Sequence, residues 1–375
     1  MPHKPLFAEL SAQLRSRIAQ AYAVGDRFPG EVELARNFDV SLVTIRQALT
    51  ALVQEGLLER QQGRGTFVRQ LPSPPVLGIY IECNIYSPKI SRWHCHLVGS
   101  VRKRLDELGL PCRVYVGRRE PANASLPQTP AMSCPEFVAD IRRGELAGVI
   151  SVSTNPHPDW VDPLSERDLP FVGTAAPTPM RVNSNMLDVF RGAIDELVRQ
   201  GRRNFAMLYW DDPQGFAAQH LVRAFHEQLQ SHRLPIDPQW IRGDLYPATP
   251  GSGWEEFREI WTSSRIKPDA LFITDDCLLP DVATVVRELR IRVPEQLMLV
   301  GAVSSDVLLP DNLPIARMET DAFAYATQLV QLMQEALAGN RTPRQREVAV
   351  QWRPLRHQAD RPRASTLNRI EQASQ

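Results

Sequence analysis

The sequence predicts an α/β protein in which an amino-terminal winged helix-turn-helix precedes a two-lobed, doubly wound body. Residues 41–66 read as a helix, a short strand, a glycine-tipped turn and a second strand, in the order of a winged helix-turn-helix. Beyond residue 76, apolar strands alternate with amphipathic helices, as parallel sheets covered by helices require. We expect a DNA-binding unit at 1–70, a proline-rich linker at 71–75, the body at 76–357 and a disordered tail at 358–375.

Composition limits the class of protein. The 375 residues carry 43 basic and 43 acidic side chains, so net charge does not indicate a nucleic-acid partner. No apolar run reaches the roughly 18 residues of a membrane span, and the first residues lack an export signal. The five cysteines are widely spaced without a C-x-x-C pair, which argues against disulfides and structural zinc. We expect a cytoplasmic protein without a membrane segment.

The first seventy residues contain three helical patterns. Leucines and an isoleucine at helical spacing predict a helix over 5–22, and EVELARNF predicts a second over 31–38. Ser41 is a natural N-cap for a third helix, which buries Ile45, Leu49 and Leu52. Its exposed amino-terminal end is where a recognition helix reads bases, and LLER and TFVRQ pair around QQGRG as the wing.

The segment GEVELARNFDVSLVTIRQALTALVQEGLLERQQGRGTFV resembles the DNA-binding domain of the GntR family, whose VSRxTVRxAL motif appears here as VSLVTIRQAL. Two positions depart from the family: Leu42 replaces a commonly DNA-contacting arginine, and Gly30 replaces the serine of the PSE motif. The alternative role for Arg46 is an intradomain ion pair, and capping alone would explain Ser41. The resemblance implies contacts with a double-stranded DNA operator by Glu31, Ser41, Thr44, Arg46, Gln47, Gln62, Gly63, Arg64, Gly65 and Thr66.

The body resembles the LacI/GalR-type effector domain, which is similar to periplasmic sugar-binding proteins. The resemblance rests on LAGVISVS, AIDELVRQGRRNFAMLYW and KPDALFITDDCLLPDVATVVRELRIRVPEQLMLVGAV. A GntR-type head on such a body resembles the arabinose-repressor subgroup. In this fold a ligand lies between the lobes, against loops at the carboxyl ends of strands. The effector-binding residues expected from these positions are Asn84, Tyr86, Ser153, Asn185, Trp210, His220, Asp275 and Asp276, with Asp276 aligned to the aspartate of the family's ND motif.

Several departures leave the nature of the pocket open. Leu221 stands where the family has a pocket arginine, Val303 where an aspartate follows VG, and Asn185 where VxxD ends. His220 and Arg223 flank the missing arginine and are candidate substitutes. Trp93, Trp160 and Trp210 have packing against a lobe face as their alternative role.

No string typical of an enzyme or cofactor site occurs, and the consecutive aspartates at strand ends suit ligand hydrogen bonding better than acid–base catalysis. His94 and His96 point about 200° apart on a helix, so we expect no metal site there. The sequence therefore predicts a homodimeric transcription regulator, a repressor, controlled by a carbohydrate-like molecule and needing no cofactor. The alternatives are a constitutive DNA-binding protein with a ligand-free body, and an enzyme.

Overall fold

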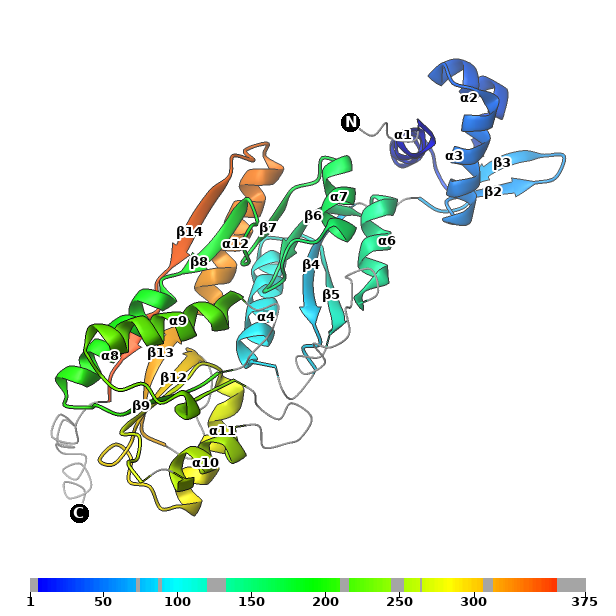
Figure 1. Ribbon diagram of the computed structural model, residues 1–375. Helices are drawn as coiled ribbons and strands as arrows, with labels where there is room; N and C mark the ends of the chain where they lie inside the picture. The colour runs from blue at the N-terminus through cyan, green and yellow to red at the C-terminus, as the bar shows by residue number, and fades with distance from the viewer. Residues whose placement is uncertain are drawn as a thin grey trace, which may run out of the picture.

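The computed structural model describes residues 6–71, 75–86, 90–119, 133–209, 216–243, 253–263, 265–305 and 313–355 (Figure 1). Most of the expected linker, the expected tail and Trp210 lie outside the described residues. Within the described part of the chain, no helix is both long enough and apolar enough to cross a membrane.

The winged helix-turn-helix is confirmed. Its core is formed by apolar side chains at helical spacing, among them the fully buried Leu14, Ile18, Leu34, Ile45 and Leu52. Strand β1 was not predicted, because its two residues lie in a segment rich in glycine and proline; it pairs antiparallel with β3. The elements are α1 (Leu6–Ala21), β1 (Arg27–Phe28), α2 (Glu31–Phe38), α3 (Leu42–Gln54), β2 (Leu58–Gln61) and β3 (Gly65–Val68), with the sheet in the order β1-β3-β2.

The first lobe of the body is a six-stranded parallel sheet in the order β14-β8-β7-β6-β4-β5. Helices α4 and α12 pack against each other, and their apolar side chains share one core with β4 and β6. The elements of this lobe are β4 (Val76–Cys83), α4 (Arg92–Glu107), β5 (Cys112–Arg119), α6 (Pro135–Arg143), β6 (Leu146–Ser151), α7 (Pro158–Glu166), β7 (Phe171–Gly173), β8 (Met180–Ser184), α12 (Ala322–Leu337) and β14 (Arg344–Val348).

The second lobe has its own six-stranded sheet, in the order β10-β9-β11-β12-β13-β15, which is parallel except for β15. Its two apolar clusters lie on opposite sides of that sheet, as the doubly wound prediction requires. The elements are α8 (Met186–Arg199), β9 (Phe205–Leu208), α9 (Phe216–Ser231), η1 (Pro238–Trp240), β10 (Ile241–Arg242), α10 (Trp254–Ser263), β11 (Ala270–Ile273), η2 (Asp276–Leu278), α11 (Leu279–Glu288), β12 (Met298–Ser304), β13 (Ile315–Thr320) and β15 (Gln351–Arg353).

The polypeptide crosses from one lobe to the other several times at their junction. Within the described residues, the chain passes from one lobe to the other at 184–186, 320–322 and 348–351. Asn185 ties two of these crossings together, because its side-chain oxygen accepts a hydrogen bond of 2.7 Å from the backbone N–H of Val350. The junction is therefore a set of adjacent strand ends joined by a side chain.

Two of the three tryptophans singled out by the sequence have packing roles. Trp160 is fully buried in the first lobe, 6.0 Å from both the Tyr80 and Phe137 rings between centroids. Trp93 is half-buried on α4 and meets the ring of Tyr325 edge-on at 5.1 Å. The packing alternative holds for this pair.

Candidate nucleic-acid interface and interlobe contact

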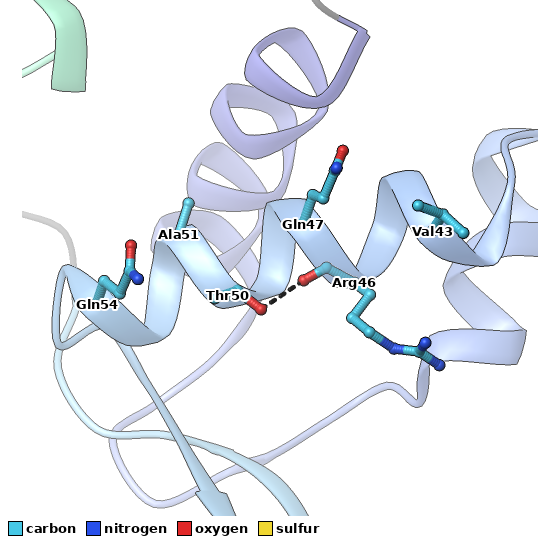
Figure 2. A pocket seen from close by; sticks show the side chains of 6 residues that line it. All are labelled: Val43, Arg46, Gln47, Thr50, Ala51 and Gln54. Carbon is cyan, nitrogen blue, oxygen red and sulfur yellow. Dashed lines mark hydrogen bonds between the residues drawn. The ribbon is translucent and has the colours of Figure 1, made fainter.

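The outer face of α3 is the candidate base-reading surface. Ser41 caps the helix as predicted, since its hydroxyl oxygen accepts a hydrogen bond of 3.1 Å from the Thr44 backbone N–H. Burial of Ile45, Ala48, Leu49 and Leu52 on one side turns the other side outward. A shallow hollow of about 320 Å³ runs along that side (Figure 2), lined at helical spacing by Val43, Arg46, Gln47, Thr50, Ala51 and Gln54.

Glu31 joins the recognition helix to the wing. Its carboxylate accepts hydrogen bonds from Arg46 at 3.0 Å and from Arg60 of β2 at 3.1 Å. The Arg46 side chain nevertheless stays 60% exposed. Arg46 thus forms the intradomain ion pair that was its alternative role, while its exposure on the outer face leaves it accessible to DNA.

The wing is a hairpin whose geometry depends on two glycines. Gly63 and Gly65 have φ angles of 72° and 118°, which favour glycine. The wing turn is shorter than the predicted QQGRG: Gln61 belongs to β2 and Gly65 to β3, so the connection is limited to Gln62, Gly63 and Arg64. The exposed Arg27 lies beside the turn, with its Nε 3.2 Å from where a Cβ would stand on Gly65.

The structure adds candidate DNA contacts that sequence reasoning missed. Thr50 and Gln54 continue the Arg46 stripe by one and two helical turns, and the helical spacing alone was a sufficient signal for them. Arg27 and Arg60 lie next to the wing only because β1, β2 and β3 pair in a particular register, which the sequence does not reveal. Leu42, the departure from the family motif, is 44% exposed at the start of α3.

Asp276 lies at the contact between the lobes. It follows β11 in the second lobe and is 6% exposed. Its Oδ1 accepts hydrogen bonds from the Ser91 hydroxyl at 2.8 Å and the Arg92 backbone N–H at 3.0 Å, both at the start of α4 in the first lobe. Burial and then the negative charge of Asp276 raise the pKa of Cys95, one turn into α4. The best sequence candidate for effector binding is thus hydrogen-bonded to the opposite lobe.

The other expected effector residues lie at several places. Asn84 and Tyr86 follow β4, where the Asn84 side-chain oxygen accepts a 3.0 Å hydrogen bond from the Tyr86 N–H, and the Tyr86 residue is 82% exposed. Ser153 follows β6 with a φ of 46°. Asn185 lies at the junction already described. The remaining two described members are Asp275, half-buried beside Asp276, and His220, exposed on α9.

The family departures in the second lobe have a structural explanation. Leu221 and Val303 are 9% and 5% exposed, and both pack in apolar clusters. Arg223, a suggested substitute for the missing arginine, pairs instead with Glu227 at 2.8 Å. Among the described residues no group of three or more His, Cys, Asp or Glu side chains is placed to hold a metal ion.

Comparison with known proteins agrees with this geometry. Residues 6–68 match the model of bacterial regulatory proteins of the gntR family, and residues 194–355 match that of the periplasmic binding protein-like domain. The chain thus combines a gntR-family DNA-binding domain with a periplasmic-binding-protein-like domain, the construction of a GntR/LacI-like transcription regulator.

Over most of its length the chain is similar to the arabinose metabolism transcriptional repressor of Geobacillus stearothermophilus. The two are 24% identical over 318 residues, which are 79% of this chain and 81% of that repressor. The mannosyl-D-glycerate transport/metabolism system repressor MngR of Escherichia coli (strain K12) is 44% identical over 71 residues. That match covers only 19% of this chain and 30% of MngR.

Solved structures show the same fold. The transcriptional regulator CelR in complex with cellobiose has a TM-score of 0.59 at 16% identity, covering 93% of this chain and 99% of that chain. A lac repressor dimer bound to operator and the anti-inducer ONPF has a TM-score of 0.59 at 15% identity, covering 75% of this chain and 93% of that chain. At these identities the likeness concerns architecture alone.

Proposed function

We propose that this protein is a cytoplasmic repressor whose affinity for an operator is controlled by a carbohydrate bound between the lobes. The observation that carries the proposal is the outward face of α3, where Arg46 and Gln47 are exposed beside a hairpin bearing Arg60 and Arg64. A helix of this kind fits the major groove, while arginines of the wing meet the neighbouring phosphates.

The body supports the sensing part of the proposal. In doubly wound folds the ligand usually lies at the carboxyl ends of the strands, and Asp275 and Asp276 follow the carboxyl end of β11, where the second lobe meets α4. Asp275 and Asp276 supply carboxylate oxygens there, and carboxylates pair well with sugar hydroxyls. The arabinose repressor and the cellobiose-bound regulator to which the chain is similar make arabinose and cellobiose the first compounds to examine.

A homodimer follows from the geometry of the target. A single winged domain buries little surface on DNA, and two-fold symmetric regulators read two half-sites of a pseudo-palindrome. The winged domain is nearly neutral, with nine Lys and Arg against seven Asp and Glu over residues 1–70, so doubling it adds needed phosphate contacts.

The deciding experiment is a gel-shift titration of the full chain on DNA from its own promoter region, with arabinose, cellobiose and a panel of other sugars. We expect tight binding that one sugar releases. Tight binding that no sugar changes would favour the second candidate, a constitutive DNA-binding protein. That candidate is supported by the apolar Leu221 and Val303, which fill positions the family uses for ligands. Absence of DNA binding would contradict both.

A further inference from the structure

The Asp276 carboxylate bridges the lobes at the amino terminus of α4. Helix α4 is 16 residues long, and its positive end carries backbone N–H groups without partners inside the helix. Ser91 provides the local cap, accepting a 3.3 Å hydrogen bond from the Trp93 N–H. Asp276 then adds a negative charge from the opposite lobe, 185 residues away in sequence from Ser91, and accepts from the Ser91 hydroxyl and the Arg92 N–H.

The second oxygen of the Asp276 carboxylate is the other notable feature of this interlobe contact. Asp276 Oδ2 is buried and has no hydrogen-bond partner among the described residues. A buried charged oxygen without a donor is costly, so a donor supplied by a bound molecule would be strongly favoured there. One oxygen therefore holds the lobes together, and the other lacks a donor that a bound molecule could supply.

We propose that the bridge of Asp276 to Ser91 and Arg92 is an interlobe latch that sets how often the lobes are closed before any effector arrives. The latch and the effector site share one carboxylate. A ligand that binds only closed lobes has an apparent affinity proportional to the fraction of molecules whose lobes are closed. The latch therefore also sets the effector concentration at which the protein responds. This regulatory part rests on the proposed function, whereas the latch itself does not.

Three variants of the full chain separate the roles of the carboxylate. Asp276→Ala removes the latch and the second oxygen. Asp276→Asn keeps one oxygen for Ser91 and Arg92 but places an amide nitrogen, a donor, at the second oxygen. Ser91→Ala removes one donor of the latch and leaves the carboxylate intact. Glu259→Ala is the control, since it deletes an exposed carboxylate of the second lobe that pairs with Arg242 at 3.0 Å and belongs to neither the latch nor the expected effector residues.

The first measurement is small-angle X-ray scattering without any sugar. We expect a larger radius of gyration in Asp276→Ala and Ser91→Ala, and the wild-type radius in Asp276→Asn and Glu259→Ala. Unchanged scattering from both Asp276→Ala and Ser91→Ala overturns the latch, as does expansion of Glu259→Ala to the same extent. Circular dichroism melting confirms that each variant is folded; should Asp276→Ala fail to fold, Ser91→Ala alone decides.

The second measurement is operator affinity by fluorescence anisotropy, again without sugar. We expect Asp276→Ala and Ser91→Ala to shift the operator Kd in the same direction by about 5- to 150-fold, the usual range of allosteric coupling. Expanded scattering with an unchanged operator Kd would retain the latch and refute its link to DNA binding. If neither the wild type nor any variant binds DNA, the proposed function is wrong. The latch is then still tested by the scattering measurement alone.

Discussion

Replacing Arg46 by alanine tests the recognition helix most directly. Arg46 lies on the outer face of α3 with its side chain 60% exposed, and its ion-pair partner there is Glu31. An arginine contact to a base pair contributes about 1–3 kcal/mol to DNA binding, so the variant should bind about 5- to 150-fold more weakly per winged domain. The pair with Glu31 is exposed and contributes at most about 1 kcal/mol to stability, so the urea midpoint should barely move.

The assay is fluorescence anisotropy with a labelled promoter duplex at several salt concentrations. If Arg46 contacts a phosphate, the slope of log K against log salt falls by about 0.9; if it contacts a base edge, the slope stays and discrimination at one base pair is lost. Arg199→Ala is the control, because that arginine is 69% exposed and paired with Glu196 in the second lobe. Equal DNA affinity of the Arg46 and Arg199 variants would refute the assignment and leave the ion pair as the role of Arg46.

Three further outcomes test the local chemistry. Ser41→Ala should lower the free energy of unfolding by about 1 kcal/mol in urea titrations, because it removes the cap of α3; an unchanged midpoint would contradict the cap. Gly117→Ala should abolish soluble expression, since its Cβ would stand 1.9 Å from a backbone carbonyl oxygen of β4, whereas Gly99→Ala, with nothing within 4 Å, should leave the melting temperature unchanged or higher. Burial raises the pKa of Cys134 from 9.0 to about 11, so this thiol stabilises the folded state below its unfolded pKa and that stabilisation is lost as pH rises through the folded value. Urea midpoints should therefore fall between about pH 9 and about pH 11, and fall less in Cys134→Ala; an equal fall in both proteins would rule out this thiol as a cause.

The sequence predicts elements whose signal is local. Helix α2 has the predicted bounds, and the α3 cap at Ser41 and the apolar stripe of α3 are as expected, because each depends on residues within a few turns. Strands β1, β8, β10, β13, β14 and β15 were not predicted. They have two to six residues, many of them polar, and owe their structure to pairing with a neighbouring strand.

The same distinction applies to the sites. The exposure of Arg46 follows from its helical position, but its link through Glu31 to Arg60 depends on how the wing packs beside α2. Family resemblance singled out Asp276, yet its bridge to Ser91 requires two lobes to meet. Which candidate residues already have hydrogen-bond or ion-pair partners therefore depends on tertiary contacts, which the sequence does not reveal.

The crossing of the polypeptide between the lobes has a consequence for synthesis on the ribosome. The winged domain is continuous in sequence and can fold as soon as it emerges. The first lobe instead needs α12 for its core and β14 for its sheet edge, and the second needs β15, all encoded after residue 320. A nascent chain stopped before that point would present a finished DNA-reading head on a body with an uncovered core. Such a truncated product would be a substrate for chaperones and proteases, and one that still binds DNA would escape control by the body.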